Sequence, residues 1–116
     1  MDALSLLQQS PVMPVIVINE LDTAVDLARA LVAGGIRSLE VTLRSGAALE
    51  AIRMIGAEVP DAIVGVGTVR NAAQLEAALK AGAPFALSPG LTPDLAAAAR
   101  VLPVPFLPGV DTPAEA

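Results

Sequence analysis

The sequence predicts an α/β fold, namely a partial (β/α)8 TIM barrel of about five βα units. Five short apolar runs begin at residues 13, 38, 62, 84 and 104 and alternate with Ala- and Leu-rich segments of helical spacing. The runs are apolar at nearly every position, as expected for parallel strands that are covered on both faces. The even spacing of the units favours a barrel over other parallel sheets.

Each predicted strand is short and bounded by polar or turn-forming residues. The five expected strands are Met13–Ile18, Ser38–Leu43, Ala62–Val66, Pro84–Leu87 and Val104–Leu107. Between them, apolar residues recur every three or four positions, which indicates helices that pack one face on the sheet. These apolar stripes are Val25, Ala28, Leu31 and Val32 in the first helix, Leu49, Ile52 and Ile55 in the second, and Leu75, Ala78 and Leu79 in the third.

Capping residues mark the expected helix ends. The side chains that could accept a hydrogen bond from a first helical turn are Asp22, Ser45, Asn71 and Thr92. Gln74 completes a capping box with Asn71, and Pro93 suits the first position of a fourth helix. The glycines expected to end helices in the left-handed conformation are Gly34, Gly35 and Gly82. Pro60 is expected to end the second helix.

The last residues predict the start of a fifth helix. Thr112-Pro113-Ala114-Glu115 combines an N-cap, a proline at the first helical position and a capping-box glutamate. Eight units of roughly 23 residues would need about 185 residues, near the lower limit for such barrels. We therefore expect residues 1–116 to form a single incomplete TIM-barrel domain with strands 1–5, helices 1–4 and the start of helix 5.

A doubly wound nucleotide-binding sheet is the alternative fold for alternating strands and helices. Such folds usually carry a glycine-rich, phosphate-binding turn after the first strand. The turn here, Asn19–Asp22, is acidic and has no glycine, so it would repel a phosphate. This favours the barrel.

Composition excludes several classes of function. The 116 residues are 54% hydrophobic and 16% charged, with a net charge of −5, two Phe and no Tyr or Trp, which argues against nucleic-acid binding. The chain has neither Cys nor His, so disulfides, thiolate metal sites, cysteine nucleophiles and histidine bases are excluded. No apolar run reaches 18 residues and no basic leader is present. We expect a cytoplasmic protein without a metal or a cofactor.

The candidate chemistry lies where strands end, because barrel active sites form at the carboxyl ends of the strands. In the second strand Glu40, Thr42 and Arg44 share one face, which would point into the barrel, while the alternate apolar residues would face the helices. A carboxylate inside a barrel is costly unless it is paired or used. Glu40 could be a general acid/base with Arg44 as an anion clamp, or the two could form a structural ion pair. A third alternative is that the strand is misplaced and Glu40 lies in solvent.

Two turns and one lysine are weaker indications of a functional site. Gly65-Val-Gly-Thr68 indicates a close approach of the backbone, and Thr68 could offer its hydroxyl and amide to an anion; a tight turn would explain the same residues. Ser88-Pro89-Gly90 is a turn motif at the end of the fourth strand. Lys80, the single lysine, is expected in the last turn of the third helix, where a cation stabilises the helix end.

Taken together, the motifs resemble the KHG/KDPG aldolase family, the bacterial 2-keto-3-deoxy-6-phosphogluconate aldolases. The resemblance rests on Pro14–Val17, Ala33–Gly35, Leu39–Arg44, Ile63–Thr68, Ser88–Gly90 and Leu107–Gly109, which occur in order over essentially the whole chain. It implies a class I aldolase that cleaves a 2-keto acid phosphate to pyruvate and glyceraldehyde 3-phosphate through a Schiff base. It also implies that Glu40 is the general acid/base, that Arg44 and Thr68 hold the pyruvate carboxylate, and that Pro89 lines the pyruvate pocket.

The same resemblance places the Schiff-base lysine on a sixth strand and the phosphate site in later turns, beyond Ala116. The chain alone is therefore expected to be inactive, and the parent enzyme is expected to be a homotrimer. Two alternatives stay open: a non-enzymatic assembly or scaffold module that pairs through open strand edges, and a different phosphate-binding barrel enzyme. The sequence leaves open which 2-keto-3-deoxy acid is preferred.

Overall fold

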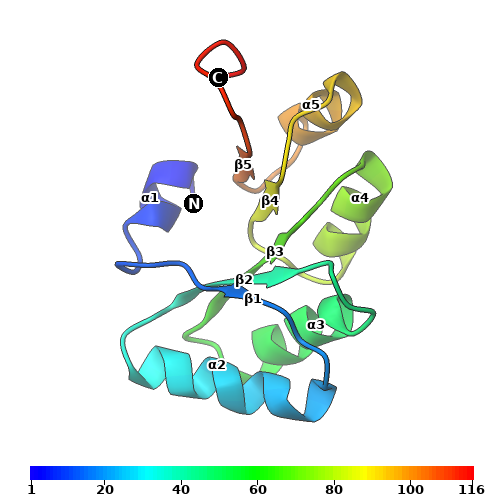
Figure 1. Ribbon diagram of the computed structural model, residues 1–116. Helices are drawn as coiled ribbons and strands as arrows, with labels where there is room; N and C mark the ends of the chain where they lie inside the picture. The colour runs from blue at the N-terminus through cyan, green and yellow to red at the C-terminus, as the bar shows by residue number, and fades with distance from the viewer.

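The computed structural model describes residues 1–116 as one five-stranded parallel sheet flanked by helices (Figure 1). The strands are β1 (Val15–Ile16), β2 (Ser38–Thr42), β3 (Ile63–Gly67), β4 (Ala86–Ser88) and β5 (Phe106–Pro108). They lie side by side in sequence order, β1-β2-β3-β4-β5, and every neighbouring pair is parallel. A doubly wound sheet would reverse this order at a switch point, so the structure confirms five units of a barrel wall.

The helices connect successive strands. They are α1 (Ala3–Leu7), the 3-10 turn η1 (Leu21–Thr23), α2 (Ala24–Ala33), α3 (Ala48–Glu58), α4 (Ala72–Lys80) and α5 (Pro93–Arg100). Figure 1 shows α2 to α5 around one side of the curved sheet and α1 on the other. The backbone amide of Ser38 donates to Ser10, and Arg37 donates to Gln9. These contacts hold the segment after α1 beside the beginning of β2. No helix is long and apolar enough to cross a bilayer.

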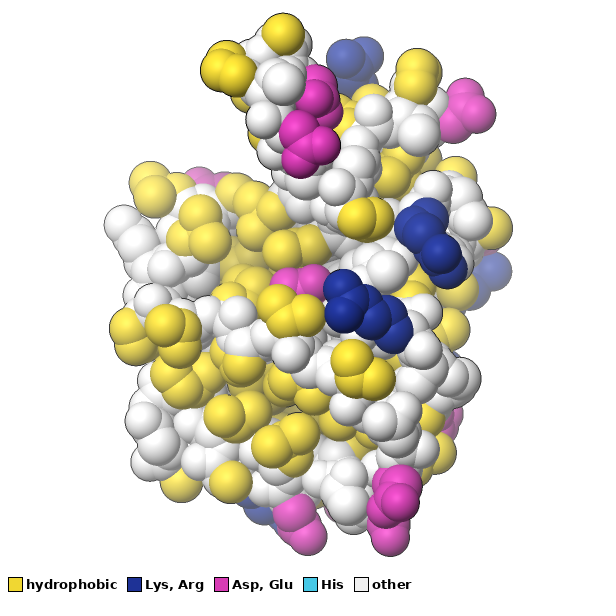
Figure 2. Space-filling model, in the orientation of Figure 1, with side chains coloured by type: hydrophobic (Ala, Val, Ile, Leu, Met, Phe, Trp, Pro, Cys, Tyr) yellow, Lys and Arg dark blue, Asp and Glu magenta, His cyan; other side chains and the backbone are white.

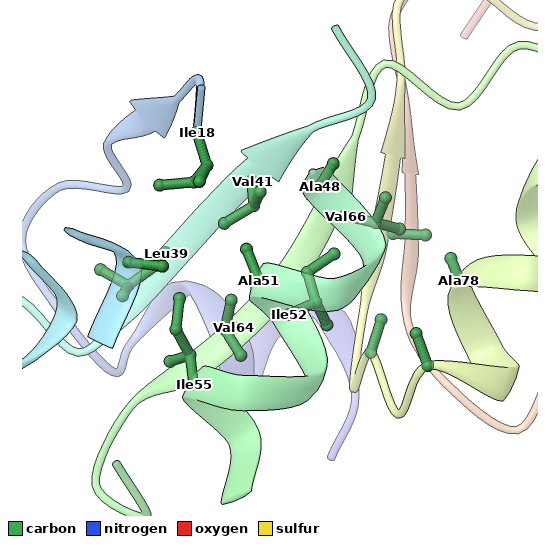
Figure 3. Packing of buried hydrophobic residues seen from close by; sticks show 14 of the residues in the cluster. Ile18, Leu39, Val41, Ala48, Ala51, Ile52, Ile55, Val64, Val66 and Ala78 are labelled. Carbon is green, nitrogen blue, oxygen red and sulfur yellow. The ribbon is translucent and has the colours of Figure 1, made fainter. Parts of the chain in front are cut away.

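The core lies between the sheet and its outer helices. β2 and β3 contribute alternate residues, Leu39 and Val41 from one strand and Val64 and Val66 from the next, all at most 3% exposed. Ile52 and Ile55 of α3 pack against them, with Ala51 between (Figure 3). The predicted parity of β2 is therefore confirmed, because its apolar residues face the helices and leave Glu40 on the inner face.

Two of the four predicted N-caps are confirmed and two are wrong. Asn71 accepts from the amide of Gln74 at 2.8 Å, and Thr92 accepts from Leu95 at 3.2 Å. Asp22 instead lies inside η1, so α2 begins after Thr23. Ser45 precedes a turn, and α3 begins after Ala47. The Ser45 hydroxyl donates to the carbonyl of Ile18, so this side chain ties the end of β1 to the turn after β2.

Other boundaries differ in detail from the sequence prediction. Gly35 and Gly82 have φ of +94° and +92°, as expected after a helix, but Gly34 has an ordinary φ of −83°. The Gln74 side chain accepts from the amide of Arg70 instead of the cap residue. All strands except β3 are shorter than the predicted apolar runs, and β3, β4 and β5 each end one residue later than predicted, at Gly67, Ser88 and Pro108. α1, a helix of five residues, was not predicted.

Residues 112–115, the predicted helix start, form a turn. The amide of Glu115 donates to the carbonyl of Thr112 at 3.1 Å, and the Glu115 carboxylate accepts from the Thr112 hydroxyl at the same distance. Neither bond of a capping box forms, because the Glu115 amide donates to the Thr112 carbonyl and the two side chains contact each other. The predicted helix start is therefore wrong for these residues.

Candidate active site

All four site residues predicted from the sequence line one hollow of about 200 Å³ on the inner face of the sheet. Glu40 and Arg44 come from β2 and the turn after it, Thr68 follows β3, and Pro89 follows β4. Three neighbours complete the lining: Val15, Leu87 and Ser88. Figure 2 shows acidic and basic side chains next to each other on this face, among hydrophobic ones. Sequence-distant residues therefore meet at the carboxyl ends of adjacent strands.

Glu40 reaches this hollow because of the register of the sheet. Val15 of β1, Glu40 of β2 and Gly65 of β3 form one row of paired residues, and the side chains of Val15 and Glu40 share the inner face. The Glu40 side chain is half-buried and extends over β3, where Gly67 offers no side chain. A Cβ atom at Gly67 would stand only 2.6 Å from Glu40 Cδ. The carboxylate thus rests against bare backbone.

Burial controls the electrostatics of this carboxyl. Loss of solvent raises the pKa of Glu40 above its ordinary value, and the positive charge of Arg44 opposes this in part. The ion pairs of the chain are Asp26–Arg29, Glu50–Arg53 and Glu76–Lys80, all on exposed helix faces. Glu40 and Arg44 therefore form no structural ion pair, and both remain able to meet a ligand.

The raised pKa predicts a pH-dependent gain of stability on replacing Glu40 by Gln. The folded chain binds the Glu40 proton more tightly than the unfolded chain, so stability falls as pH rises through the interval between the two pKa values. At neutral pH, Glu40→Gln should be more stable than wild type by on the order of 0.5 kcal/mol, a figure kept small by solvent screening. Below pH 4.5, the ordinary pKa of a glutamate carboxyl, this gain in stability should vanish.

Urea denaturation of both chains across this pH range measures the effect. Asp61→Asn, which removes an exposed carboxylate in the turn between α3 and β3, is the matched control. A Glu40→Gln variant that is less stable than wild type at neutral pH would show that the carboxylate is stabilised by a partner, contrary to the contacts described above.

Thr68 has an unusual backbone. Its φ is +61°, and it is the one residue other than glycine with positive φ. This conformation is costly for a β-branched side chain, and such strain is concentrated at functional sites. The neighbouring backbone is fixed on both sides, since Leu43 donates to Gly67 at 3.0 Å and Val69 donates to Leu87 at 3.2 Å. Neither the amide nor the hydroxyl of Thr68 donates within the chain, so both are available to an anion.

The turn after β4 forms a rigid wall of the hollow. The Ser88 hydroxyl donates to the carbonyl of Gly90 at 2.7 Å, and the amide of Gly109 donates to the carbonyl of Ser88 at 2.8 Å. A Cβ at Gly109 would stand 2.7 Å from the carbonyl carbon of Pro89, so the turn after β5 packs tightly against the turn after β4. Pro89 is thereby held at the edge of the site.

Lys80 does not belong to the site. It is the last residue of α4, three-quarters exposed, and its Nζ lies 3.0 Å from Glu76 Oε1. This confirms the helix-end position predicted for it. No group of three acidic side chains gathers anywhere in the chain to hold a metal ion.

Sequence reasoning missed three lining residues and one close approach. Val15 and Leu87 were read only as strand residues and Ser88 only as part of a turn, although the pairing of Val15 with Glu40 in the β1–β2 register could have indicated the first. The glycine pattern before Thr68 indicated that something approaches the backbone closely, and the structure identifies it as the Glu40 side chain.

A model of the aldolase family described as KDPG and KHG aldolase matches residues 4–116. The chain belongs to this family. A 2-dehydro-3-deoxy-phosphogluconate aldolase from Dickeya dadantii is 57% identical over 95% of this chain and 52% of its own length. The KHG/KDPG aldolase of Escherichia coli K12 is 55% identical over 96% of this chain and 52% of its own. The chain thus spans about half the length of the curated KDPG and KHG aldolases that it matches.

Solved structures of KDPG aldolases superimpose on this chain. The 2-keto-3-deoxy-6-phospho-gluconate aldolase from Zymomonas mobilis superimposes with a TM-score of 0.94 at 50% identity, over 99% of this chain and 55% of its own. The KDPG aldolase from Legionella pneumophila gives 0.92 at 45% identity, over 96% and 54% respectively. That structure holds pyruvate captured as a covalent carbinolamine intermediate. The KDPG and KHG aldolase fold is therefore shown for these five units.

Proposed function

We propose that residues 1–116 are the amino-terminal part of a single-domain barrel aldolase that cleaves a 2-keto-3-deoxy acid phosphate to pyruvate and glyceraldehyde 3-phosphate. The observation that carries this proposal is the half-buried Glu40 in a hollow where Arg44 and Thr68 are free to bind an anion. Membership of the KDPG and KHG aldolase family supports the reaction type.

Glu40 is the proposed general acid/base. In such a reaction an amine attacks the C2 carbonyl of the keto acid, the resulting carbinolamine loses water, and the iminium takes up the electrons of the breaking C3–C4 bond. The C4 hydroxyl loses its proton as the aldehyde forms, and the enamine is later protonated at C3. Water then hydrolyses the resulting iminium, which breaks the C–N bond and releases pyruvate and the amine. A carboxyl whose pKa is raised by burial holds a proton more readily than an exposed carboxyl does, which suits a group that must both accept and return protons.

The remaining lining residues would bind the keto acid. Arg44 is exposed at the end of β2 and has no acidic partner, so its planar fork suits a substrate carboxylate. The unpaired amide and hydroxyl of Thr68 offer two further donors. Pro89 and the apolar side chains of Val15 and Leu87 would cover the methylene carbons. We therefore expect the substrate carboxylate to bind at Arg44 and the reacting carbons to lie over Glu40.

The Schiff-base amine is proposed to come from the part of the enzyme that these five units do not include. Lys80 faces solvent on α4 and is paired with Glu76, so it has neither the position nor the desolvated environment that activates a lysine nucleophile. We expect the 116-residue chain to remain unlabelled when it is treated with pyruvate and borohydride.

The decisive experiment joins residues 1–116 to the remaining half of the Dickeya dadantii relative, which is 57% identical over the shared region. This fused protein should be trapped by borohydride in the presence of pyruvate and should release pyruvate from the 2-keto-3-deoxy acid phosphate. A folded fusion that is neither trapped nor active would overturn the proposal. Labelling of Lys80 in the short chain, located by peptide mass spectrometry, would also contradict it.

Assembly, location and substrate preference are further parts of the proposal. We expect the complete enzyme to be a homotrimer in the cytoplasm, acting on a small-molecule substrate without nucleic acid or membrane. Analytical ultracentrifugation of the fused protein tests the trimer. Its relative kcat/KM for phosphogluconate, phosphogalactonate and hydroxyglutarate derivatives tests which acid is preferred.

A further inference from the structure

We infer that Gly67 is the residue that positions the Glu40 carboxylate, because it keeps a place on β3 empty for that side chain. Gly67 ends β3 and pairs with Thr42, two residues beyond the Glu40–Gly65 pair. The three atoms nearest to the position of a Gly67 Cβ all belong to Glu40, namely Oε1, Cδ and Cγ. The inference rests on the proposed role of Glu40 as the acid/base.

Phe85 explains why the carboxylate lies over Gly67. The place directly across from Glu40, over Gly65, is filled by the Phe85 ring, whose Cζ lies 2.5 Å from the position of a Gly65 Cβ. This ring is fully buried, so it does not give way to Glu40. The carboxylate therefore lies diagonally, one pleat nearer to the carboxyl ends of the strands and to Thr68. Gly65 and Gly67 lie on one face of β3, but Gly65 leaves space for Phe85 whereas Gly67 leaves space for Glu40.

A single methyl group at Gly67 is enough to displace the carboxylate. Glu40 has three rotatable bonds, whereas Gly67 is held by the β2–β3 ladder and by the hydrogen bond from Leu43 at 3.0 Å. Gly67 also has no positive φ, so alanine fits its backbone. The added Cβ would push the flexible side chain toward the mouth of the hollow, where solvent and Arg44 both stabilise the ionised form. The carboxylate would no longer lie where the reacting carbons are proposed to bind.

Titration of Glu40 in the 116-residue chain tests this directly. The carboxyl carbons of glutamate are labelled with 13C, and the Glu40 resonance is identified by its loss in Glu40→Gln. Its titration midpoint should lie lower in Gly67→Ala than in wild type. Gly56→Ala, at an exposed position of α3 with nothing within 4 Å of the added carbon, is the matched control and should leave the midpoint unchanged. Equal midpoints in wild type and Gly67→Ala would overturn the inference.

A double-mutant cycle keeps the test decisive if Gly67→Ala weakens the fold. The loss of stability caused by Gly67→Ala is measured once with Glu40 present and once with Glu40→Ala. Because the new Cβ meets Glu40 first, most of the loss should disappear in the Glu40→Ala background. An equal loss in both backgrounds would mean that the strand itself rejects a side chain, which is incompatible with a role in positioning Glu40.

Kinetics of the fused protein link the positioning to the reaction. Gly67→Ala should lower kcat by about 10²-fold, the cost of a misplacement on the order of 1 Å, with a much smaller change in KM. Gly56→Ala should alter neither. An unchanged kcat in Gly67→Ala would contradict the inference. A wild-type fusion without activity would defeat the proposed function instead, and the titration and the cycle would then decide the role of Gly67 by themselves.

Discussion

Replacing Glu40 by Gln is expected to lower kcat of the fused aldolase by about 10²- to 10⁴-fold, the usual contribution of a general acid/base. Glutamine has nearly the same shape and fits the same place over Gly67, but it can neither take nor return a proton at neutral pH. The rate of pyruvate release under saturating substrate measures the loss. Binding of the keto acid should be largely retained, since Arg44 and Thr68 are unchanged.

Glu50→Gln is the matched control for this loss of activity. Glu50 lies in the first turn of α3, is half-exposed, and pairs with Arg53 outside the hollow. Its replacement should leave kcat unchanged. The pH profile adds a second readout, because the ionisation assigned to Glu40 should be missing from the profile of Glu40→Gln. A Glu40→Gln enzyme that keeps kcat within about threefold of wild type would remove Glu40 from the mechanism.

The position of Glu40 could be predicted from the sequence because a parallel strand has a strict period of two. Leu39 and Val41 had to face the helices, so the residue between them had to face the barrel interior. The alternation of strands and helices, read with the even spacing of the units, was likewise enough to place Thr68 and Pro89 at the same edge of the sheet. These features depend on local pattern alone.

The contacts around Glu40 could not be predicted in the same way. Which residue of β3 lies beside Glu40 depends on the register of the two strands, and which ring fills the space over Gly65 depends on the start of β4. The wrong N-caps have a related cause. Ser45 has a suitable side chain, but its hydroxyl finds an acceptor on Ile18, distant in sequence, and the helix starts later.

α1 shows the same limit of sequence-based prediction, in this case for a helix that was present but not predicted. Its five residues are too few for a stable isolated helix. One contact and the burial of one side chain support it: Asp2 accepts from the amide of Ser5 at 2.8 Å, and Leu6 is 1% exposed in the folded chain. The contact is a local capping signal, whereas the burial exists only after folding. Tertiary burial therefore decides whether this segment is a helix.

Gly65→Ala is expected to destabilise the chain by about 1–3 kcal/mol, the range for overpacking a close-packed interior. The added carbon would overlap the Phe85 ring, which is rigid, fully buried and the largest of the completely buried side chains. Relief would require a shift of β4 or of the ring, and the ring is completely buried. Urea denaturation at a fixed pH measures the loss.

Gly67→Ala is the natural comparison, because the two glycines lie on the same face of the same strand. At Gly67 the obstacle is the free end of a flexible side chain, so the substitution should mainly move a carboxylate and cost less stability. At Gly65 the obstacle is a fixed ring, so the cost should appear in the free energy of unfolding. Phe85→Leu should reduce the cost of Gly65→Ala much more than that of Gly67→Ala. If both glycines responded alike to Phe85→Leu, β3 would require glycine for its backbone alone, and the division between a glycine for the core and a glycine for the site would be wrong.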